Sequence, residues 1–241
     1  MTRTTVSDAL AQRIASLRWD ELLATLDHQG FAQTPLLLSA RECSALAALY
    51  DSGGFRRTVV MGRHRFGEGE YKYFADPLPA AVAELRARLY PPLAALANGW
   101  AERLGEDVRY PATLRAFLER CHRAGQTRPT PLMLRYGAGD WNALHQDLYG
   151  ELAFPFQAVT VLERPGRDFR GGEFVLLEQR PRAQSRAHVA PLRRGGFLIF
   201  TTRQRPVRGR RGFYRSAMRH GVSTVTEGRR TTLGIIFHDA A

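Results

Sequence analysis

Cysteine, lysine and long apolar runs are scarce in this sequence, and each shortage narrows what the chain can be. Nothing approaches the roughly eighteen consecutive apolar residues of a membrane-spanning helix, and Met1–Ser7 lacks the apolar core of a signal peptide. We therefore expect a cytoplasmic protein that does not enter a membrane. The only cysteines, Cys43 and Cys121, belong to no cluster with metal-ligand spacing, so we expect buried free thiols.

Positive charge dominates the composition. Lysine and arginine together number 35 against 23 acidic residues, which gives a formal net charge of +12. Such a balance is typical of proteins that bind polyanions, nucleic acid above all. Lys72 is the sole lysine, however, and arginine in place of lysine is also the mark of a GC-rich coding sequence. The charge favours a nucleic-acid partner without deciding for one.

The first half of the chain is predicted to be mainly helical. Apolar residues at helical spacing predict a helix over residues 6–28, and Ser39 with Glu42 forms a capping box that opens a second helix. A long amphipathic helix is predicted over residues 79–104, bent or interrupted at the Pro91–Pro92 pair. Shorter elements are expected in addition: strands over residues 31–38 and 59–61, and a helix over residues 114–123.

From residue 132 onward the pattern changes to short strands separated by turns. Branched and aromatic residues dominate these strands, which indicates a sandwich or a barrel. We expect a single domain over residues 1–241, in which residues 1–130 give mainly helical support and a substrate-side loop. The strands are expected over residues 132–136, 156–162, 173–177, 195–200 and 231–237.

A His-x-Asp triplet, His145 to Asp147, follows a glycine-rich turn in the second half. Side chains two apart on an extended segment point to the same face, so both can reach one point in space. His220, far downstream, offers a third ligand, and two imidazoles with one carboxylate form the facial triad of non-heme Fe(II) oxygenases. By itself the triplet is weak, because a structural histidine beside a turn aspartate gives the same pattern.

A second segment strengthens the metal hypothesis. Arg230 follows His220 by ten residues, and Thr232 lies two further on. If His220 ends one strand and Arg230 lies on the next, antiparallel strand, the guanidinium points into the cavity that holds the metal and can take a carboxylate in a two-pronged ion pair. Thr232, on the same face, adds a hydroxyl donor. A diacid that chelates the metal at one end and meets an arginine at the other fits 2-oxoglutarate.

These motifs resemble the 2-oxoglutarate/Fe(II)-dependent dioxygenase superfamily, with His145, Asp147 and His220 as metal ligands and Arg230-Thr-Thr232 as the cosubstrate segment. The resemblance implies an α+β fold, in which a double-stranded β-helix (jelly roll) over residues 131–241 forms the oxygenase core and the N-terminal helical region braces its sheet. It also implies Fe(II) and 2-oxoglutarate as cofactors, with oxidation of a substrate C–H bond and release of succinate.

Two branches of the superfamily are similar to this chain in different places. The run that opens with Arg135-Tyr136 and ends in the His-x-Asp triplet is similar to AlkB-type nucleic-acid dealkylases, in which the tyrosine also contacts 2-oxoglutarate. Leu134 stands where those proteins have an asparagine, and their second arginine has no clear counterpart. The ten-residue gap before the cosubstrate arginine, together with Gly171-Gly172-Glu173-Phe174, is similar to prolyl hydroxylases. As a whole, residues 131–241 resemble a bacterial family of oxygenases linked to damaged DNA.

Substrate contacts are predicted in two arginine-containing segments. Arg63, His64, Tyr71 and Tyr73 lie close together in sequence, where rings can stack on an unpaired base and cations can meet phosphate. Seven arginines occur in the nineteen residues before His220, and a loop there is expected at the mouth of the site. Solvated loops are the alternative in both places. The arginines of this loop expected to meet phosphates are Arg208, Arg210 and Arg211.

The sequence is compatible with three alternative functions. The first is oxidative dealkylation of alkylated or damaged nucleic acid, with single-stranded or damaged DNA as the expected partner. The second is hydroxylation of a protein residue such as proline, or of a small molecule, by an enzyme of the same superfamily. The third is a non-catalytic basic nucleic-acid-binding module, which the joint presence of the three ligands and the arginine argues against.

Overall fold

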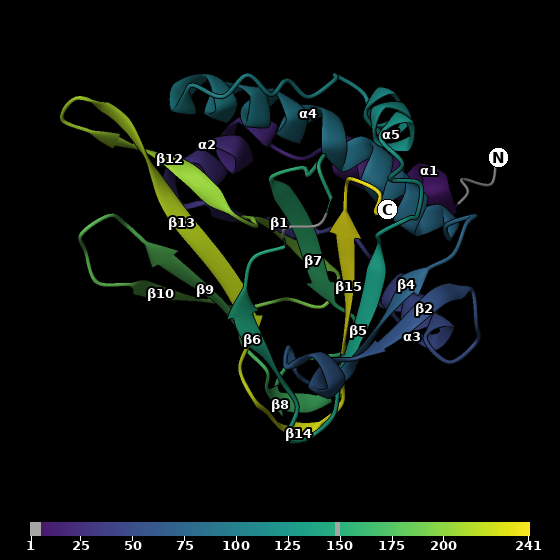
Figure 1. Cartoon of the computed structure of the whole chain (residues 1–241). Helices are drawn as coiled ribbons and strands as arrows, with labels where there is room; N and C mark the ends of the chain where they lie inside the picture. Colours follow the sequence, from purple (N-terminus) through teal and green to yellow (C-terminus); the bar gives the residue numbers. More distant parts are fainter. Residues whose placement is uncertain (1–5, 148–149) are drawn as a thin grey trace.

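The computed structural model of the chain describes residues 6–147 and 150–241, and Figure 1 shows their arrangement. The helices are α1 (Val6–Ala15), α2 (Trp19–Gln29), α3 (Ala40–Leu49), the 3-10 turn η1 (Met61–His64), α4 (Ala80–Leu104) and α5 (Leu114–Arg123). The strands are β1 (Phe31–Leu36), β2 (Phe55–Val60), β3 (Gly67–Glu68), β4 (Glu70–Phe74), β5 (Leu132–Tyr136), β6 (Trp141–His145), β7 (Phe156–Val161), β8 (Phe169–Gly171), β9 (Phe174–Gln179), β10 (Arg186–Ala190), β11 (Gly196–Thr201), β12 (Gln204–Gly209), β13 (Gly212–Val222), β14 (Val225–Gly228) and β15 (Arg230–Ile236).

Two antiparallel sheets face each other, and helices cover the outer side of the larger one (Figure 1). The seven-stranded sheet has the order β1-β11-β7-β15-β5-β4-β2. The six-stranded sheet has the order β10-β9-β13-β6-β3, with β12 added on β13, and β8 pairs with β14 separately. The α+β class and the double-stranded β-helix expected from the sequence are therefore confirmed.

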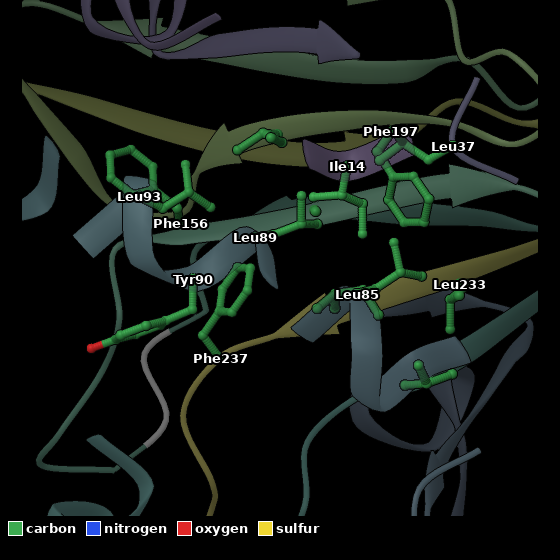
Figure 2. Close-up of a cluster of buried hydrophobic side chains, with 14 of the residues drawn as sticks. Ile14, Leu37, Leu85, Leu89, Tyr90, Leu93, Phe156, Phe197, Leu233 and Phe237 are labelled. Atoms are coloured by element: carbon green, nitrogen blue, oxygen red, sulfur yellow. The ribbon is translucent and has the colours of Figure 1, made fainter. Parts of the chain in front are cut away.

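Strand β15 illustrates how alternation along one strand builds both sides of the larger sheet. Leu233 and Ile235 belong to the hydrophobic cluster under the helices, whereas Thr232, Gly234 and Ile236 face a cavity between the two sheets. Figure 2 shows Leu233 among side chains of α4 and neighbouring strands. Full burial of one such side chain contributes about 1.5–3 kcal/mol. The helical layer thereby fixes the sheet from which the cavity wall is made.

The N-terminal helices differ in detail from the prediction. Residues 6–28 do not form one helix, because the chain leaves the helical path between α1 and α2 and buries Leu17 in the core. Helix α2 then ends at Gly30, which has a positive φ of 84°. The capping box is present as predicted: the Ser39 hydroxyl accepts from the Glu42 amide, and the Glu42 carboxylate accepts from the Ser39 amide.

Helix α4 is continuous through the Pro91–Pro92 pair, so the predicted interruption does not occur. The residues on either side, Leu89, Tyr90 and Leu93, are completely buried against the larger sheet and α5, and Figure 2 shows all three in the core. This packing offsets the cost of prolines inside a helix, about 3 kcal/mol each. Among the described residues no helix, α4 included, combines the length and apolar character needed to cross a membrane.

The larger sheet is not confined to residues 131–241. Strands β1, β2 and β4 come from the N-terminal half and join the sheet at its two edges. The segment that the sequence suggested as a loop is in part strand β4, which pairs with both β2 and β5. As predicted, Cys43 and Cys121 are buried free thiols, and burial raises the pKa of Cys43 to about 11. The N-terminal half therefore supplies part of the wall around the cavity as well as helical support.

Candidate active site

His145, Asp147 and His220 come together on the inner face of the smaller sheet. His145 ends β6, Asp147 follows it, and His220 lies directly opposite His145 on β13, with ring centroids 4.2 Å apart. The Nε2 atoms of His145 and His220 lie 3.4 Å from Oδ1 and Oδ2 of Asp147, respectively. One ligand atom from each residue lies within 4.8 Å of the others. Two imidazoles and one carboxylate in this arrangement fit non-heme Fe(II).

A β-bulge aims the first histidine. His145 lies three positions after Asn142 on β6, but their partners His220 and Val222 lie only two positions apart on β13. The extra residue shifts the side-chain alternation of β6 between Asn142 and His145, and both residues line the cavity. Gly221 lies opposite the bulge, where a Cβ would meet the Asn142 carbonyl oxygen at 2.7 Å. Gly221 is thus a site residue that the sequence analysis missed.

Hydrogen bonds hold two of the ligands in place. The Nδ1 atom of His145 lies 2.7 Å from the Ala143 carbonyl oxygen, so Nδ1–H donates to it and Nε2 keeps its lone pair for a metal. The side-chain amide of Gln157 donates to Oδ2 of Asp147 at 2.7 Å. Gln157 lies on β7 of the larger sheet, so this bond ties the ligand to the opposite side of the cavity. Nothing in the sequence around Gln157 distinguished it from a core strand residue.

The charges of the three ligands are coupled. Burial raises the pKa of Asp147, but the hydrogen bonds and charges of His145 and His220 outweigh burial and hold that pKa well below its usual range. Burial lowers the pKa of His145, yet the contact with Asp147 prevails and leaves it above its ordinary value. Burial and then the charge of His145 lower the pKa of His220. A metal ion at this site therefore meets an ionised carboxylate between the two imidazoles.

Arg230 is the most unusual buried group on the far side of the cavity. It is 1% exposed, and neither Nη1 nor Nη2 has a hydrogen-bond partner in the part of the chain that the structure describes. It pairs with Tyr136 across β15 and β5, and its guanidinium carbon lies 5.4 Å from that ring's centroid. Burial lowers the pKa of Arg230 and raises that of Tyr136 to about 12. A guanidinium remains charged even so, and two free donor groups fit a carboxylate.

The position of Arg230 differs from the prediction. It does not lie on the strand after His220, because β14 intervenes and Arg230 opens β15 in the opposite sheet. The guanidinium nevertheless lines the cavity that also holds the triad. Gly172, just before β9, makes room for it: a Cβ there would lie 2.7 Å from Cδ of Arg230, and φ is +66°. In the sequence, Gly172 stood out only as part of the segment that is similar to prolyl hydroxylases.

A cavity of about 430 Å³ joins the triad to Arg230 between the two sheets. Pockets of about 300–1,000 Å³ are typical of small-molecule sites. Tyr71 and Tyr73 lie two apart on β4 and so share its cavity face, with ring centroids 5.4 Å apart at 88°. Burial raises the pKa of both phenols, which stay neutral. The polar and aromatic residues of the lining also include Tyr136, Asn142, Gln157 and Thr232.

The other expected substrate residues lie outside this lining. Neither Arg63 nor His64 is among the described residues that line the cavity. Their neighbours Arg65 and Phe66 do line it. The prediction of an arginine-rich loop at the mouth is wrong, because β12 and β13 form a hairpin that projects beyond α2 (Figure 1). The exposed tip of this hairpin carries Arg208, Arg210 and Arg211. None of the three is among the described residues that line the cavity.

Part of the arginine run stabilises the fold. Arg205 is buried and pairs with the buried Glu178 at 2.8 Å, and the Glu178 carboxylate also accepts from the Ser216 hydroxyl at 2.9 Å. Arg215 pairs at 3.2 Å with Glu106, two residues beyond the end of α4. These ion pairs link the hairpin to the sheet and to the helical layer, a role that composition alone could not distinguish from phosphate binding.

The jelly-roll fold, the His-Asp-His site and the buried arginine across the cavity define a 2-oxoglutarate-dependent non-heme iron oxygenase. The chain belongs to the family described as oxygenases catalysing oxidative methylation of damaged DNA, whose family profile matches residues 69–240. An uncharacterized protein of Mycobacterium tuberculosis is 53% identical over 168 residues, which are 70% of this chain and 72% of that protein.

Solved structures share the fold. An oxidoreductase of the 2OG-Fe(II) oxygenase family from Burkholderia pseudomallei superposes with a TM-score of 0.53 at 18% identity, over 92% of each chain. A prolyl hydroxylase from Trichoplax adhaerens, solved with a hypoxia inducible factor peptide fragment, gives a TM-score of 0.55 at 16% identity, over 94% of this chain and 90% of that one. At these identities the likeness extends to the architecture alone.

Proposed function

We propose that this oxygenase acts on alkylated nucleic acid and removes the alkyl group by oxidation. The observation that carries the proposal is the wall of the cavity that β4 provides, where Tyr71 and Tyr73 face the space beside the metal ligands. Aromatic rings give a base a surface on which to stack outside its helix. The net charge of +12 and the damaged-DNA substrate named for the family support the same choice.

Within this proposal, residues of both sheets divide the work. His145, Asp147 and His220 hold Fe(II), and Arg230 binds the far carboxylate of 2-oxoglutarate in the cavity. Thr232 shares the cavity face of β15 with Arg230 and provides a hydroxyl for the same carboxylate. Bound Fe(II) and 2-oxoglutarate supply the oxidation of an unreactive C–H bond, which amino-acid side chains cannot perform.

Removal of the alkyl group follows from where the oxygen enters. When the oxidised carbon is attached to a base nitrogen, the product is a hemiaminal. Its C–N bond breaks, the carbon leaves as an aldehyde, and the hydroxyl proton passes to the nitrogen. Oxidation at such a carbon therefore ends in dealkylation, with dioxygen and 2-oxoglutarate consumed and succinate and carbon dioxide released. The tyrosines and the apolar wall hold the base and keep bulk water from the reacting carbon.

The hairpin tip contributes at a distance from the cavity. Arg208, Arg210 and Arg211 are exposed there, and we place them on backbone phosphates of the bound strand that lie farther from the target nucleotide. Changing all three to Ala is expected to lower the slope of log K against log salt by about 0.7 for each lost phosphate contact with a single strand. Arg115→Ala on α5, where the arginine side chain is 87% exposed, is the matched control. An unchanged salt slope in the triple variant contradicts this placement.

The test of the function uses a single-stranded oligonucleotide that carries one N-alkylated base. With Fe(II), 2-oxoglutarate and air, mass spectrometry is expected to record loss of the alkyl mass in step with succinate release. Asp147→Asn is the control for metal-dependent turnover. The proposal is overturned if alkylated DNA and RNA both keep their alkyl groups while a proline-containing peptide gains one oxygen atom.

A further inference from the structure

The segment from Met61 to Gly69 crosses from one sheet to the other. It leaves β2 and returns into β4, both in the larger sheet, but between them β3 pairs with β6 of the smaller sheet. The Met61 amide donates to the Gly69 carbonyl at 2.9 Å and closes the base of this strap, residues 61–69. In Figure 1 the strap is the blue segment between β6 and β2. The region matched by the family profile begins at residue 69, where the strap ends.

Phe66 is an exposed ring at a cavity that the strap helps to enclose. It lines the cavity and is 44% exposed, and Leu144 on β6 lines the same cavity at 42% exposure. The Phe66 backbone is held at both ends, because its amide donates to the Met61 carbonyl at 3.3 Å and its carbonyl accepts from the Ala143 amide at 2.8 Å. His64 stacks on the Phe66 ring, with centroids 5.4 Å apart at 22°. An exposed apolar ring on a backbone that is held beside a site indicates a binding surface.

Positive charge flanks this ring. Arg63 and Arg65 are exposed on either side of His64, and in the part of the chain that the structure describes neither forms an ion pair. Arg65 has a positive φ of 59°, a conformation that residues other than glycine rarely adopt. Arg65 lines the cavity, whereas Arg63 does not. Rings interleaved with free cations are suited to an unpaired nucleic-acid strand.

We propose that Phe66, with His64 stacked on it and Leu144 nearby, is a platform on which the base next to the target nucleotide stacks, while Arg63 and Arg65 meet the adjoining phosphates. The inference rests on the proposed function, because it takes nucleic acid as the substrate. A target base that enters the cavity leaves its neighbour with one face unstacked, and the exposed ring of Phe66 restores that contact. The platform therefore selects an unpaired strand or a flipped nucleotide over a closed duplex.

The test measures stacking and turnover separately. A single strand with 2-aminopurine beside an N-alkylated base reports turnover, and the same strand without the alkyl group reports binding. Phe66→Ala is expected to weaken binding of both strands by about 5- to 150-fold, to reduce the quenching of 2-aminopurine and to raise KM more than it lowers kcat. Phe66→Tyr is expected to restore all three, because it keeps the ring.

Leu36→Ala is the matched control, since Leu36 is 57% exposed on β1 at the opposite edge of the larger sheet. The platform is overturned if Phe66→Ala behaves like Leu36→Ala in quenching and in affinity, or if the wild type binds the unalkylated strand without quenching. Failure of the proposed function gives a different result, in which the wild type binds and quenches but removes no alkyl group from any strand. Binding of a proline-containing peptide in place of DNA overturns both proposals.

Discussion

Replacing Arg230 with Met is expected to stabilise the protein in the absence of 2-oxoglutarate. Arg230 is 1% exposed, and both Nη groups lack a hydrogen-bond partner within the described residues, so the folded chain carries a buried charge without hydrogen bonds to it. Replacing buried ionic groups with apolar ones of similar volume is often neutral or stabilising by about 1–4 kcal/mol. In a domain of this size each kcal/mol shifts Tm by about 2–4 °C. Arg230→Met is therefore expected to unfold several degrees above the wild type.

The same substitution is expected to remove most of the affinity for 2-oxoglutarate. A hydrogen bond to a charged group contributes about 1.5–3 kcal/mol, which corresponds to a loss of about 10- to 150-fold at 1.4 kcal/mol per decade. With Mn(II) in place of iron, a ligand at 100 times its Kd stabilises the wild type by about 2.7 kcal/mol. Arg230→Met loses most of that gain. Arg230→Lys keeps the charge but not the fork, so it is expected to bind 2-oxoglutarate with intermediate affinity.

Thermal unfolding with and without 2-oxoglutarate, in the presence of Mn(II), measures both effects in one experiment. The reasoning is refuted if the Met variant unfolds well below the wild type and still gains the full stabilisation from 2-oxoglutarate. That result would mean that the guanidinium is satisfied in the ligand-free protein and that the cosubstrate carboxylate binds elsewhere.

Three further substitutions test residues that support the site. Gln157→Leu removes the amide that donates to Asp147, so metal affinity, measured by competition with a chromophoric chelator, is expected to fall about 10- to 100-fold. Gly172→Ala places a Cβ 2.7 Å from Cδ of Arg230, so the Kd for 2-oxoglutarate in calorimetry is expected to rise while metal affinity changes little. Gly221→Ala sets a Cβ against backbone oxygens of β6 at the bulge, so metal affinity is expected to fall and Tm to drop.

Glycines elsewhere in the chain provide matched controls. Gly53 also has a positive φ, but a Cβ there would have open space around it, so Gly53→Ala has the backbone strain of the Gly172 variant without its clash. Equal effects of the two on 2-oxoglutarate binding would show that strain, not contact with the arginine, is responsible. Gly99 lies inside α4 with nothing near its Cβ position. Metal affinity as high in Gly221→Ala as in Gly99→Ala would contradict the role given to the bulge.

The parts of the site that could be predicted are those that chemistry restricts to few residue types. Only histidine, cysteine and carboxylates were plausible iron ligands, so the spacing of His145 and Asp147 and the distant His220 left few alternatives. Arg230 and Thr232 could be placed on one face because a strand alternates with period two, and they do share the cavity face of β15. The jelly roll itself followed from the resemblance that these motifs carry.

The remaining parts depend on contacts between segments far apart in sequence. Gln157 reads as one more residue of a buried strand, and only the facing of the two sheets brings its amide to Asp147. The bulge in β6 arises from a register difference with β13, which no local pattern encodes. For the same reason the sequence assigned Arg230 to the wrong strand and the arginine hairpin to the mouth of the cavity. Local composition does not determine which way a hairpin projects.

The division of the site between two sheets gives the strap its importance. The metal ligands belong to the smaller sheet, whereas Arg230 and Gln157 belong to the larger one, so any relative movement of the sheets changes the distance between metal and cosubstrate carboxylate. Residues 61–69 are bonded to both sheets at this point, through β3 to β6 and through the flanking strands to the larger sheet. The proposed platform on Phe66 belongs to this segment. The proposal therefore predicts that a bound strand contacts the part of the chain that joins the two halves of the site.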